Sequence, residues 1–162
     1  MNIIEKLLNQ ASQYPSLNQE KRIDLAKNGQ HPEVALLCCS DSRVIPEDIF
    51  NVQIGDIFVI RTAGNTLGES EEASFGYAYH HLHIKEFIVL GHTRCGAISS
   101  TLNGEHGCIF DQIASHIGQT KDPTHASILN VLGVAKELRQ KFVDVNVTPL
   151  LYDIETGSLK RL

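Results

Sequence analysis

Three short apolar runs, each followed by a segment with helical signals, constrain the fold of this chain most strongly. The runs are residues 34–39, 57–60 and 86–91. Each has the length and apolar character of a buried strand. A proline with two acids at 46–48, and three acids at the start of 69–83, are typical of helix beginnings. Strands that alternate with helices predict an α/β fold with a mainly parallel central sheet flanked by helices.

Both ends of the chain extend this pattern. Apolar residues 3, 4, 7 and 8 recur at helical spacing and predict an N-terminal helical arm. Ser16 and Gln19 resemble a capping box, which predicts a second helix closed at Asn28-Gly29. Further helices are expected at 97–102, at 109–117 and from Asp122 onward, and a last strand within 143–152. Since no linker or repeat interrupts the pattern, we expect residues 1–162 to form a single domain.

Charge and hydropathy exclude several classes of partner. The chain has 14 Lys and Arg against 19 Asp and Glu, a formal net charge of −5. This balance argues against a nucleic acid or an anionic membrane as partner. No segment approaches the roughly 20 apolar residues of a membrane span, and the N-terminus lacks the apolar run of a signal peptide. We therefore expect a cytoplasmic protein with a small-molecule substrate and no membrane or nucleic-acid partner.

Two short motifs carry the chemistry. Cys39-Ser40-Asp41-Ser42-Arg43 follows the first apolar run, and His92-Thr93-Arg94-Cys95-Gly96 follows the third. The carboxyl ends of parallel strands gather functional groups at one edge of a sheet. Two thiols and an imidazole suit Zn²⁺ and leave a fourth position for water or a carboxylate. Cys39, His92 and Cys95 are therefore the candidate metal ligands.

The residues around these motifs have expected structural roles. Cys38 alternates with its neighbour along the strand, so we expect it to face away from the metal as a buried core thiol. Gly91 and Gly96 are expected to let the backbone bend on either side of the second motif. In a reducing compartment, metal or catalytic use of the four cysteines is favoured over disulfides.

These motifs resemble those of the β-class carbonic anhydrases, which carry C-x-D-S-R followed by H-x-x-C. The resemblance covers residues 28–103 well and the end of the chain less closely, while 104–145 match weakly. Other matching segments are the glycine-led strand at 55–65, the helix at 74–78 and the strand and turn at 152–157. The family places Asn where this chain has Thr62.

The resemblance implies a zinc lyase that reversibly hydrates CO₂ to bicarbonate through zinc-bound hydroxide. Cys39, His92 and Cys95 would bind Zn²⁺, and Asp41 would orient the nucleophile. Arg43 would pair with Asp41 and keep it off the metal. In a closed form Asp41 would instead be the fourth ligand and the site would be inert. We expect the open form near neutrality.

The resemblance also implies a substrate pocket and an assembly. Gln30 would donate a hydrogen bond to a substrate oxygen, and Phe58 and Tyr77 would line an apolar pocket for CO₂. From the residues alone, Gln30 could also be a solvated loop residue, and the two aromatic residues could be ordinary core. The family's site lies at a dimer interface, so we expect a homodimer or a tetramer in which Gln30 reaches the partner's site.

Two other functions fit the same residues. Relatives with the same ligands hydrolyse carbonyl sulfide or carbon disulfide, and the choice between these substrates depends on pocket shape. A non-catalytic zinc protein belongs to a different class. A structural zinc site usually has four protein ligands, and it needs no aspartate–arginine pair beside it.

Overall fold

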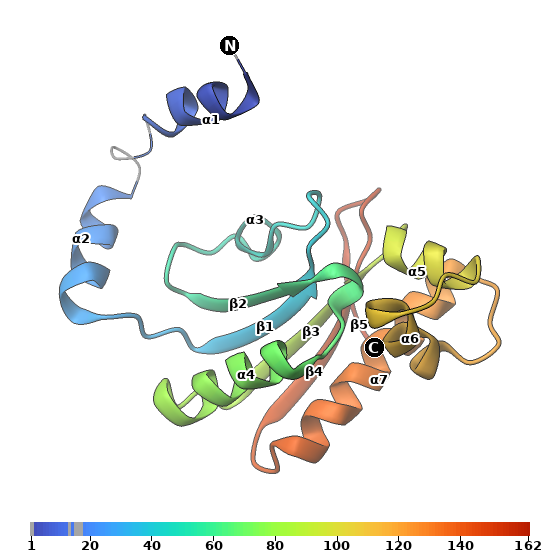
Figure 1. Ribbon diagram of the computed structural model, residues 1–162. Helices are drawn as coiled ribbons and strands as arrows, with labels where there is room; N and C mark the ends of the chain where they lie inside the picture. The colour runs from blue at the N-terminus through green and yellow to red at the C-terminus, as the bar shows by residue number, and fades with distance from the viewer. Residues whose placement is uncertain (1, 13, 15–17) are drawn as a thin grey trace.

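The computed structural model describes residues 2–12, 14 and 18–162, which contain a five-stranded sheet in the order β2-β1-β3-β4-β5 (Figure 1). The strands are β1 Val34–Cys39, β2 Ile57–Thr62, β3 Glu86–His92, β4 Asn146–Tyr152 and β5 Leu159–Arg161. The first four are parallel, and β5 runs antiparallel to β4. This confirms the predicted mainly parallel α/β fold. β5 was not predicted, because its three residues are all exposed and form no apolar run.

Helices connect the strands and form the N-terminal part of the chain. They are α1 Ile3–Ala11, α2 Gln19–Asn28, α3 Pro46–Phe50, α4 Glu69–His81, α5 Gly96–Leu102, α6 Cys108–Ile117 and α7 Pro123–Lys141, with a 3₁₀ turn, η2, at Ala63–Asn65. In Figure 1, α4 and α7 run along one face of the sheet, and α5 and α6 lie together beyond one end of it. The helices predicted from residues 46, 69, 97, 109 and 122 onward are therefore all present.

The second helix begins differently from the prediction. Ser16, half of the expected capping box, lies outside the described residues. Asn18 is the N-cap of α2, in the left-handed conformation and without a side-chain capping bond. The C-terminal end agrees with the sequence, because Gly29 closes the helix at φ 83°.

The two faces of the sheet are covered unequally. On one face, Leu37, Phe87 and Val89 pack with Phe75 of α4 and Val134 of α7 in a continuous buried cluster. On the other face, a smaller buried cluster is covered by the short α3 and by loops. Its margin contains the half-buried strand residues Ile57, Val59, Ile88 and Leu150. The sheet is thus flanked by helices as expected, but its second face is only partly covered.

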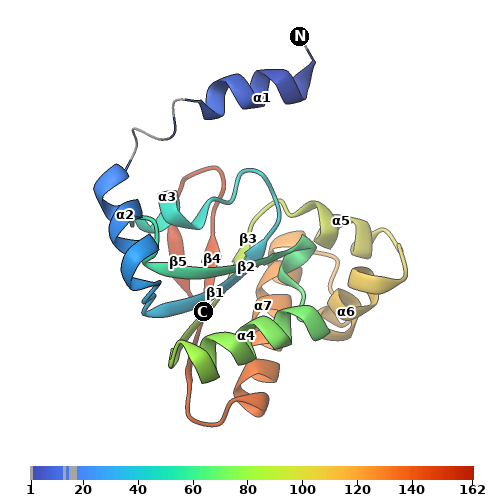
Figure 2. The same ribbon diagram turned by 60° about the vertical axis from the view of Figure 1, so that its left-hand side comes forward.

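The arm formed by α1 stands away from the sheet in both ribbon views (Figures 1 and 2). An Asn2–Glu5 capping box begins this helix, as the reciprocal hydrogen bonds of 2.9 Å show. The helix has no buried residue, and its apolar stripe is exposed, at 65% for Ile3, 60% for Ile4, 51% for Leu7 and 66% for Leu8. The predicted helical arm is present with its apolar side uncovered.

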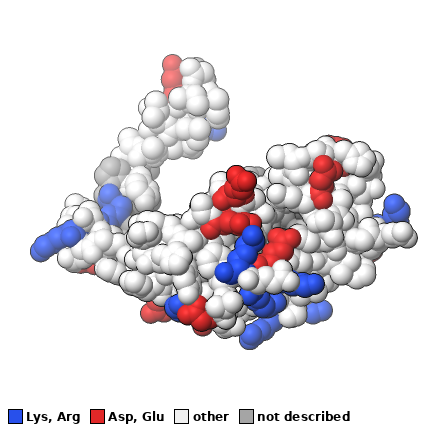
Figure 3. Space-filling model, turned by 60° about the horizontal axis from the view of Figure 1, so that its bottom comes forward, with Lys and Arg blue, Asp and Glu red and all other residues white. Residues whose placement is uncertain are grey.

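Acidic and basic side chains lie next to one another on the face shown in Figure 3. This distribution agrees with the small negative net charge of −5. Within the described part of the chain, no helix combines the length and the apolar character needed to cross a membrane.

Candidate metal centre

Three potential ligands meet at the carboxyl edge of the sheet. Cys39 ends β1, His92 ends the neighbouring β3, and Cys95 is the N-cap of α5. One ligand atom from each lies within 4.8 Å of the other two, and the two sulfur atoms are 4.0 Å apart. All three side chains are buried. The parallel pairing of β1 with β3 therefore brings together residues that are more than fifty positions apart in the sequence.

The ring of His92 is oriented for metal binding. Its Nδ1 lies 2.9 Å from the carbonyl oxygen of Thr93, which can only accept, so Nδ1 carries the hydrogen. Its Nε2 is buried and has no hydrogen-bond partner among the described residues. A buried polar atom without a partner is costly, and a cation at Nε2 would remove that cost. The ring thus fits a metal ligand with a backbone partner behind it.

The two thiols are not equivalent. The pKa of Cys39 is lowered, first by its hydrogen bond with Cys95 and also by His92, Gly64 and Asp41, against an opposing effect of burial. The pKa of Cys95 is raised by that same contact with Cys39 and by burial. One thiolate forms readily, whereas a second needs a positive charge beside it. The pair of sulfur atoms therefore fits a divalent cation that draws off both protons.

The other two cysteines lie away from this centre. Cys38 is fully buried among Leu36, Val44 and Leu90 on the opposite face, as predicted for a core thiol. Burial raises its pKa to about 12, which makes it a poor ligand and nucleophile. Cys108 is exposed at the start of α6.

The turn that carries His92 and Cys95 is braced by the end of β4. Thr93 donates its N–H to the Tyr152 carbonyl (3.0 Å), and its hydroxyl accepts from the N–H of Ile154 (3.1 Å). Arg94 adopts φ 57°, so the left-handed residue of the turn is not one of the expected glycines. Gly91 instead allows close packing, because a Cβ there would lie 2.2 Å from Val131 Cγ2 of α7.

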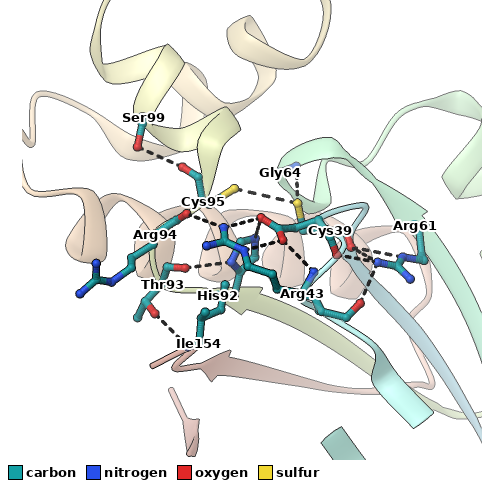
Figure 4. Close-up of polar contacts among 12 residues, drawn as sticks. Cys39, Arg43, Arg61, Gly64, His92, Thr93, Arg94, Cys95, Ser99 and Ile154 are labelled. Atoms are coloured by element: carbon teal, nitrogen blue, oxygen red, sulfur yellow. Dashed lines mark hydrogen bonds and ion pairs between the residues drawn. The ribbon is translucent and has the colours of Figure 1, made fainter. Parts of the chain in front are cut away.

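Asp41 and Arg43 lie beside the ligands and bind one another. Figure 4 shows Arg43 next to His92. Arg43 donates from Nε to Asp41 Oδ1 (2.9 Å) and from Nη2 to Oδ2 (2.7 Å), and its backbone N–H also reaches Oδ1 (3.0 Å). These hydrogen bonds hold the pKa of Asp41 well below its usual range. Asp41 Oδ2 is also 3.9 Å from His92 Nε2. The carboxylate is therefore ionised, next to the ligands and bound to arginine.

Arg61 is a supporting residue that the sequence did not reveal. From the end of β2 its guanidinium donates to three carbonyl oxygens in and just after the first motif: those of Cys39 (3.1 Å), Asp41 (2.9 Å) and Val44 (2.7 Å). These contacts hold the loop in which Asp41 and Arg43 lie (Figure 4). The register of β2 beside β1, which pairs Cys38 with Arg61, is the feature that places it there.

The three predicted substrate residues lie elsewhere in this chain. Gln30 is exposed in the segment before β1, at the amino edge of the sheet, whereas Cys39 is at the carboxyl edge. Phe58 and Tyr77 form a ring pair with centroids 6.0 Å apart on β2 and α4, and Tyr77 also stacks on His81. Since β2 is the edge strand, this aromatic pair lies at the side of the sheet. Within one chain, the predicted ligands and the Asp41–Arg43 pair therefore lie together, and these three residues are not part of that group.

Comparison with known sequences agrees with this centre. Residues 34–159 match the family model described as carbonic anhydrase. A carbonic anhydrase of Synechocystis sp. is 44% identical over 81 residues, which cover 46% of this chain and 30% of that protein. Carbonic anhydrase 2 of Mycobacterium tuberculosis is 41% identical over 90 residues, covering 56% of this chain and 43% of that protein. The alignments thus span less than half of either curated relative.

Solved structures show the same architecture over almost the whole chain. The β-carbonic anhydrase CcaA matches with a TM-score of 0.80 and 29% identity, covering 98% of this chain and 85% of that one. CafA of Aspergillus fumigatus, also a β-carbonic anhydrase, matches with a TM-score of 0.78 and 25% identity, over 99% and 91%. With the family-model match spanning both motifs, these likenesses show that the chain belongs to the β-carbonic anhydrase family.

Proposed function

We propose that this chain binds one Zn²⁺ through Cys39, His92 and Cys95 and catalyses the reversible hydration of CO₂ to bicarbonate and a proton. The observation that carries the proposal is the carboxylate of Asp41, which lies 3.9 Å from His92 Nε2 while Arg43 holds both of its oxygens. A structural zinc site takes four protein ligands, whereas a catalytic site keeps one position for the reactant. Because Arg43 binds both carboxylate oxygens of Asp41, this acid is not available as a fourth protein ligand, and the arrangement favours a catalytic site.

The residues around the ligands have separate roles in this proposal. Zinc bound by these residues would act as a Lewis acid and would make hydroxide available near neutral pH. Asp41 accepts a hydrogen bond from the attacking water and so orients its lone pair toward the carbon of CO₂. Arg43 keeps Asp41 ionised and off the metal, the open arrangement expected near neutrality. Arg61 and the Gly64 N–H hold the loop and the sulfur of Cys39.

We further propose that a second copy of the chain completes the site. Gln30 lies at the amino edge of the sheet, and Phe58 and Tyr77 lie beside the edge strand β2, so all three are away from the ligands of their own chain. The exposed stripe of α1 and the unpaired edge of β2 are surfaces that a second copy can cover. The β-carbonic anhydrases of Sordaria macrospora, whose fold matches with a TM-score of 0.76, are described as tetrameric. A homodimer or tetramer follows, with Gln30 of one copy donating to substrate in the other.

Cysteine usage supports a cytoplasmic location for this protein. All four cysteines are unpaired, as expected where thiols stay reduced. The buried clusters on the two faces share one sheet, which supports a single domain from β1 to the end of the described chain. We propose that the N-terminal helices belong to the same domain, which then comprises residues 1–162.

The proposal is tested by measuring zinc content and CO₂ hydration in two cysteine variants. Cys95→Ser removes a ligand and should lose most of the zinc and essentially all hydration. Cys38→Ser is the matched control, because this thiol is buried on the other face and should leave zinc bound. A Cys95→Ser protein with a full complement of zinc would refute the ligand assignment. If wild type hydrolyses carbonyl sulfide in a parallel assay but does not hydrate CO₂, the substrate assignment is wrong.

A further inference from the structure

The sulfur of Cys39 is held by a backbone donor whose position is itself fixed from further away. Gly64, in the 3₁₀ turn η2, donates its N–H to Cys39 Sγ at 3.2 Å. Gly64 has φ 70°, and a Cβ there would lie 2.7 Å from Ile113 Cδ1. The turn is therefore packed tightly against α6, and small changes in the Gly64 peptide alter its hydrogen bond to the sulfur.

The carbonyl of the same glycine is bound by a buried amide. Asn130 of α7 is 1% exposed and donates from Nδ2 to the Gly64 carbonyl oxygen at 2.8 Å. Since a carbonyl can only accept, this contact fixes which end of the amide carries the oxygen. Asn130 Oδ1 then faces Nδ1 of His116, 3.0 Å away, and must accept from it.

His116 connects this amide to an acid at the surface. Its other nitrogen, Nε2, lies 2.9 Å from Glu137 Oε1. Both ring nitrogens thus face side-chain oxygen atoms, so the ring links Asn130 to Glu137. The His116 side chain is 12% exposed and that of Glu137 40%, so the outer end of the chain of contacts meets solvent.

Helix α7 has a residue that makes room for this ring. A Cβ at Gly133 would lie 2.4 Å from the Cγ and Cδ2 atoms of His116. Glycine inside a helix costs about 1 kcal/mol relative to alanine. Its presence in the middle of α7 allows the imidazole to lie against the helix between Asn130 and Glu137.

We propose that Glu137, His116 and Asn130 form a hydrogen-bond chain that positions Gly64. The position of Gly64 thereby determines how well its N–H donates to the sulfur of Cys39. The ring of His116 holds the Asn130 amide in place, and the amide holds the carbonyl of Gly64. The position of Gly64 in turn directs its N–H, which belongs to the preceding peptide unit, toward the sulfur of Cys39. Asn130 and His116 are positioning residues, because they contact neither the substrate nor the three metal-binding side chains. Outer contacts of this kind commonly change metal affinity by about 10- to 100-fold.

The test compares zinc retention and the cobalt spectrum in three variants of the full chain. Asn130→Asp keeps the shape of the side chain but has no N–H to donate to Gly64. Glu137→Ala removes the outer acceptor at a half-exposed position, where folding should be unaffected. Lys136→Ala is the control, because this exposed neighbour lines the same surface pocket as His116 and Glu137. Zn²⁺ loss to a chelator and the thiolate-to-cobalt absorption band of the Co²⁺-substituted protein are recorded for each.

We expect Asn130→Asp to retain Zn²⁺ about 10-fold or more less well than wild type and to shift the cobalt–thiolate band. Glu137→Ala should change Zn²⁺ retention and the cobalt–thiolate band in the same direction but by a smaller amount, and Lys136→Ala should match wild type. Folded Asn130→Asp and Glu137→Ala proteins with unchanged retention and an unchanged band would overturn the proposal, even if their melting temperatures fall. The inference rests on the proposed metal site. If wild type binds neither Zn²⁺ nor Co²⁺, both fail, whereas metal binding without CO₂ hydration would leave this inference standing.

Discussion

At the scale of single residues, the candidate centre separates the groups that bind from the groups that hold them. Cys39, His92 and Cys95 present ligand atoms to one point. Their partners are mostly backbone atoms: the Thr93 carbonyl behind His92 and the Gly64 N–H beside Cys39. Backbone partners cannot rotate away as side chains do. The three ligands are therefore fixed before any metal arrives, which favours binding by reducing the entropy lost.

Replacement of Arg43 tests the role of its pair with Asp41. Arg43→Ala removes the two side-chain hydrogen bonds that hold the carboxylate and leaves only the backbone N–H of residue 43, so Asp41 then competes for the metal. We expect the variant to keep its zinc and to lose CO₂ hydration by about 10- to 100-fold. Arg94→Ala is the control, because that arginine makes an exposed ion pair with Glu155, worth at most about 1 kcal/mol. Near wild-type hydration by Arg43→Ala across neutral pH would show that the pair is only structural.

The ligands could be predicted from sequence because their residue types and local spacing are distinctive. Arg61 could not, since its role depends on which carbonyls the loop after β1 turns toward it. The conformation of the second motif was also predicted wrongly in detail. Arg94, a residue without special backbone freedom, takes the left-handed position at φ 57°, and Gly91 serves the packing of α7.

At the scale of elements, parallel strands bring the two motifs to one edge, and loops at the opposite edge join the helices to the sheet. The strands at 34–39, 57–62 and 86–92 were predicted within a few residues, because each contains a short apolar run. The strand at 146–152 was predicted less sharply, within 143–152, because only alternate residues of it are buried. β5 and the start of α2 were not predicted correctly. Neither element has a buried apolar face, and β5 takes its conformation only from its pairing with β4.

Asp144 joins three elements at the amino edge and gives a pH-dependent prediction. Lys85 donates to it at 2.6 Å, and the Tyr79 hydroxyl also donates to it, so α4, the start of β3 and the start of β4 are tied together. The lysine lowers the pKa of Asp144, and the carboxylate raises that of Lys85. A lowered acid pKa stabilises the fold above the unfolded value near 4, and a raised lysine pKa stabilises it below the unfolded value near 10.4.

Wild type should therefore be more stable than Asp144→Asn between about pH 4 and pH 10. The advantage should be modest, because both charges are exposed to solvent. It should disappear as pH falls through the lowered pKa of Asp144. Thermal unfolding of the two proteins from pH 3 to pH 8 measures this directly. A constant difference in melting temperature at every pH would contradict it.

At the scale of the whole molecule, one chain leaves several surfaces uncovered. The apolar stripe of α1 is exposed, and the second face of the sheet is only partly covered. The predicted substrate residues lie away from the ligands of their own chain. The sequence resemblance identified these residues as substrate-binding. The sequence pattern of one chain does not show whether they line the site of their own copy or that of a partner. Their placement is what makes assembly part of the proposed activity.

Disruption of the α1 stripe tests that dependence. Ile4→Ser with Leu8→Ser replaces two side chains that are 60% and 66% exposed in the single chain, so the fold of the monomer should not change. We expect light scattering to show a smaller assembly, with a parallel loss of CO₂ hydration. Lys6→Ser on the same helix is the control. A wild-type protein that is a stable, active monomer would contradict the proposed assembly.

The central claim is that CO₂ hydration by this protein requires one Zn²⁺ bound by Cys39, His92 and Cys95. The most direct measurement strips the wild-type protein of metal with a chelator and follows CO₂ hydration as Zn²⁺ is returned in known amounts. We predict negligible hydration without metal, a linear rise with added Zn²⁺, and a plateau at one equivalent per chain. Hydration that persists in the metal-free protein, or a fully loaded protein that remains inactive, would contradict the account.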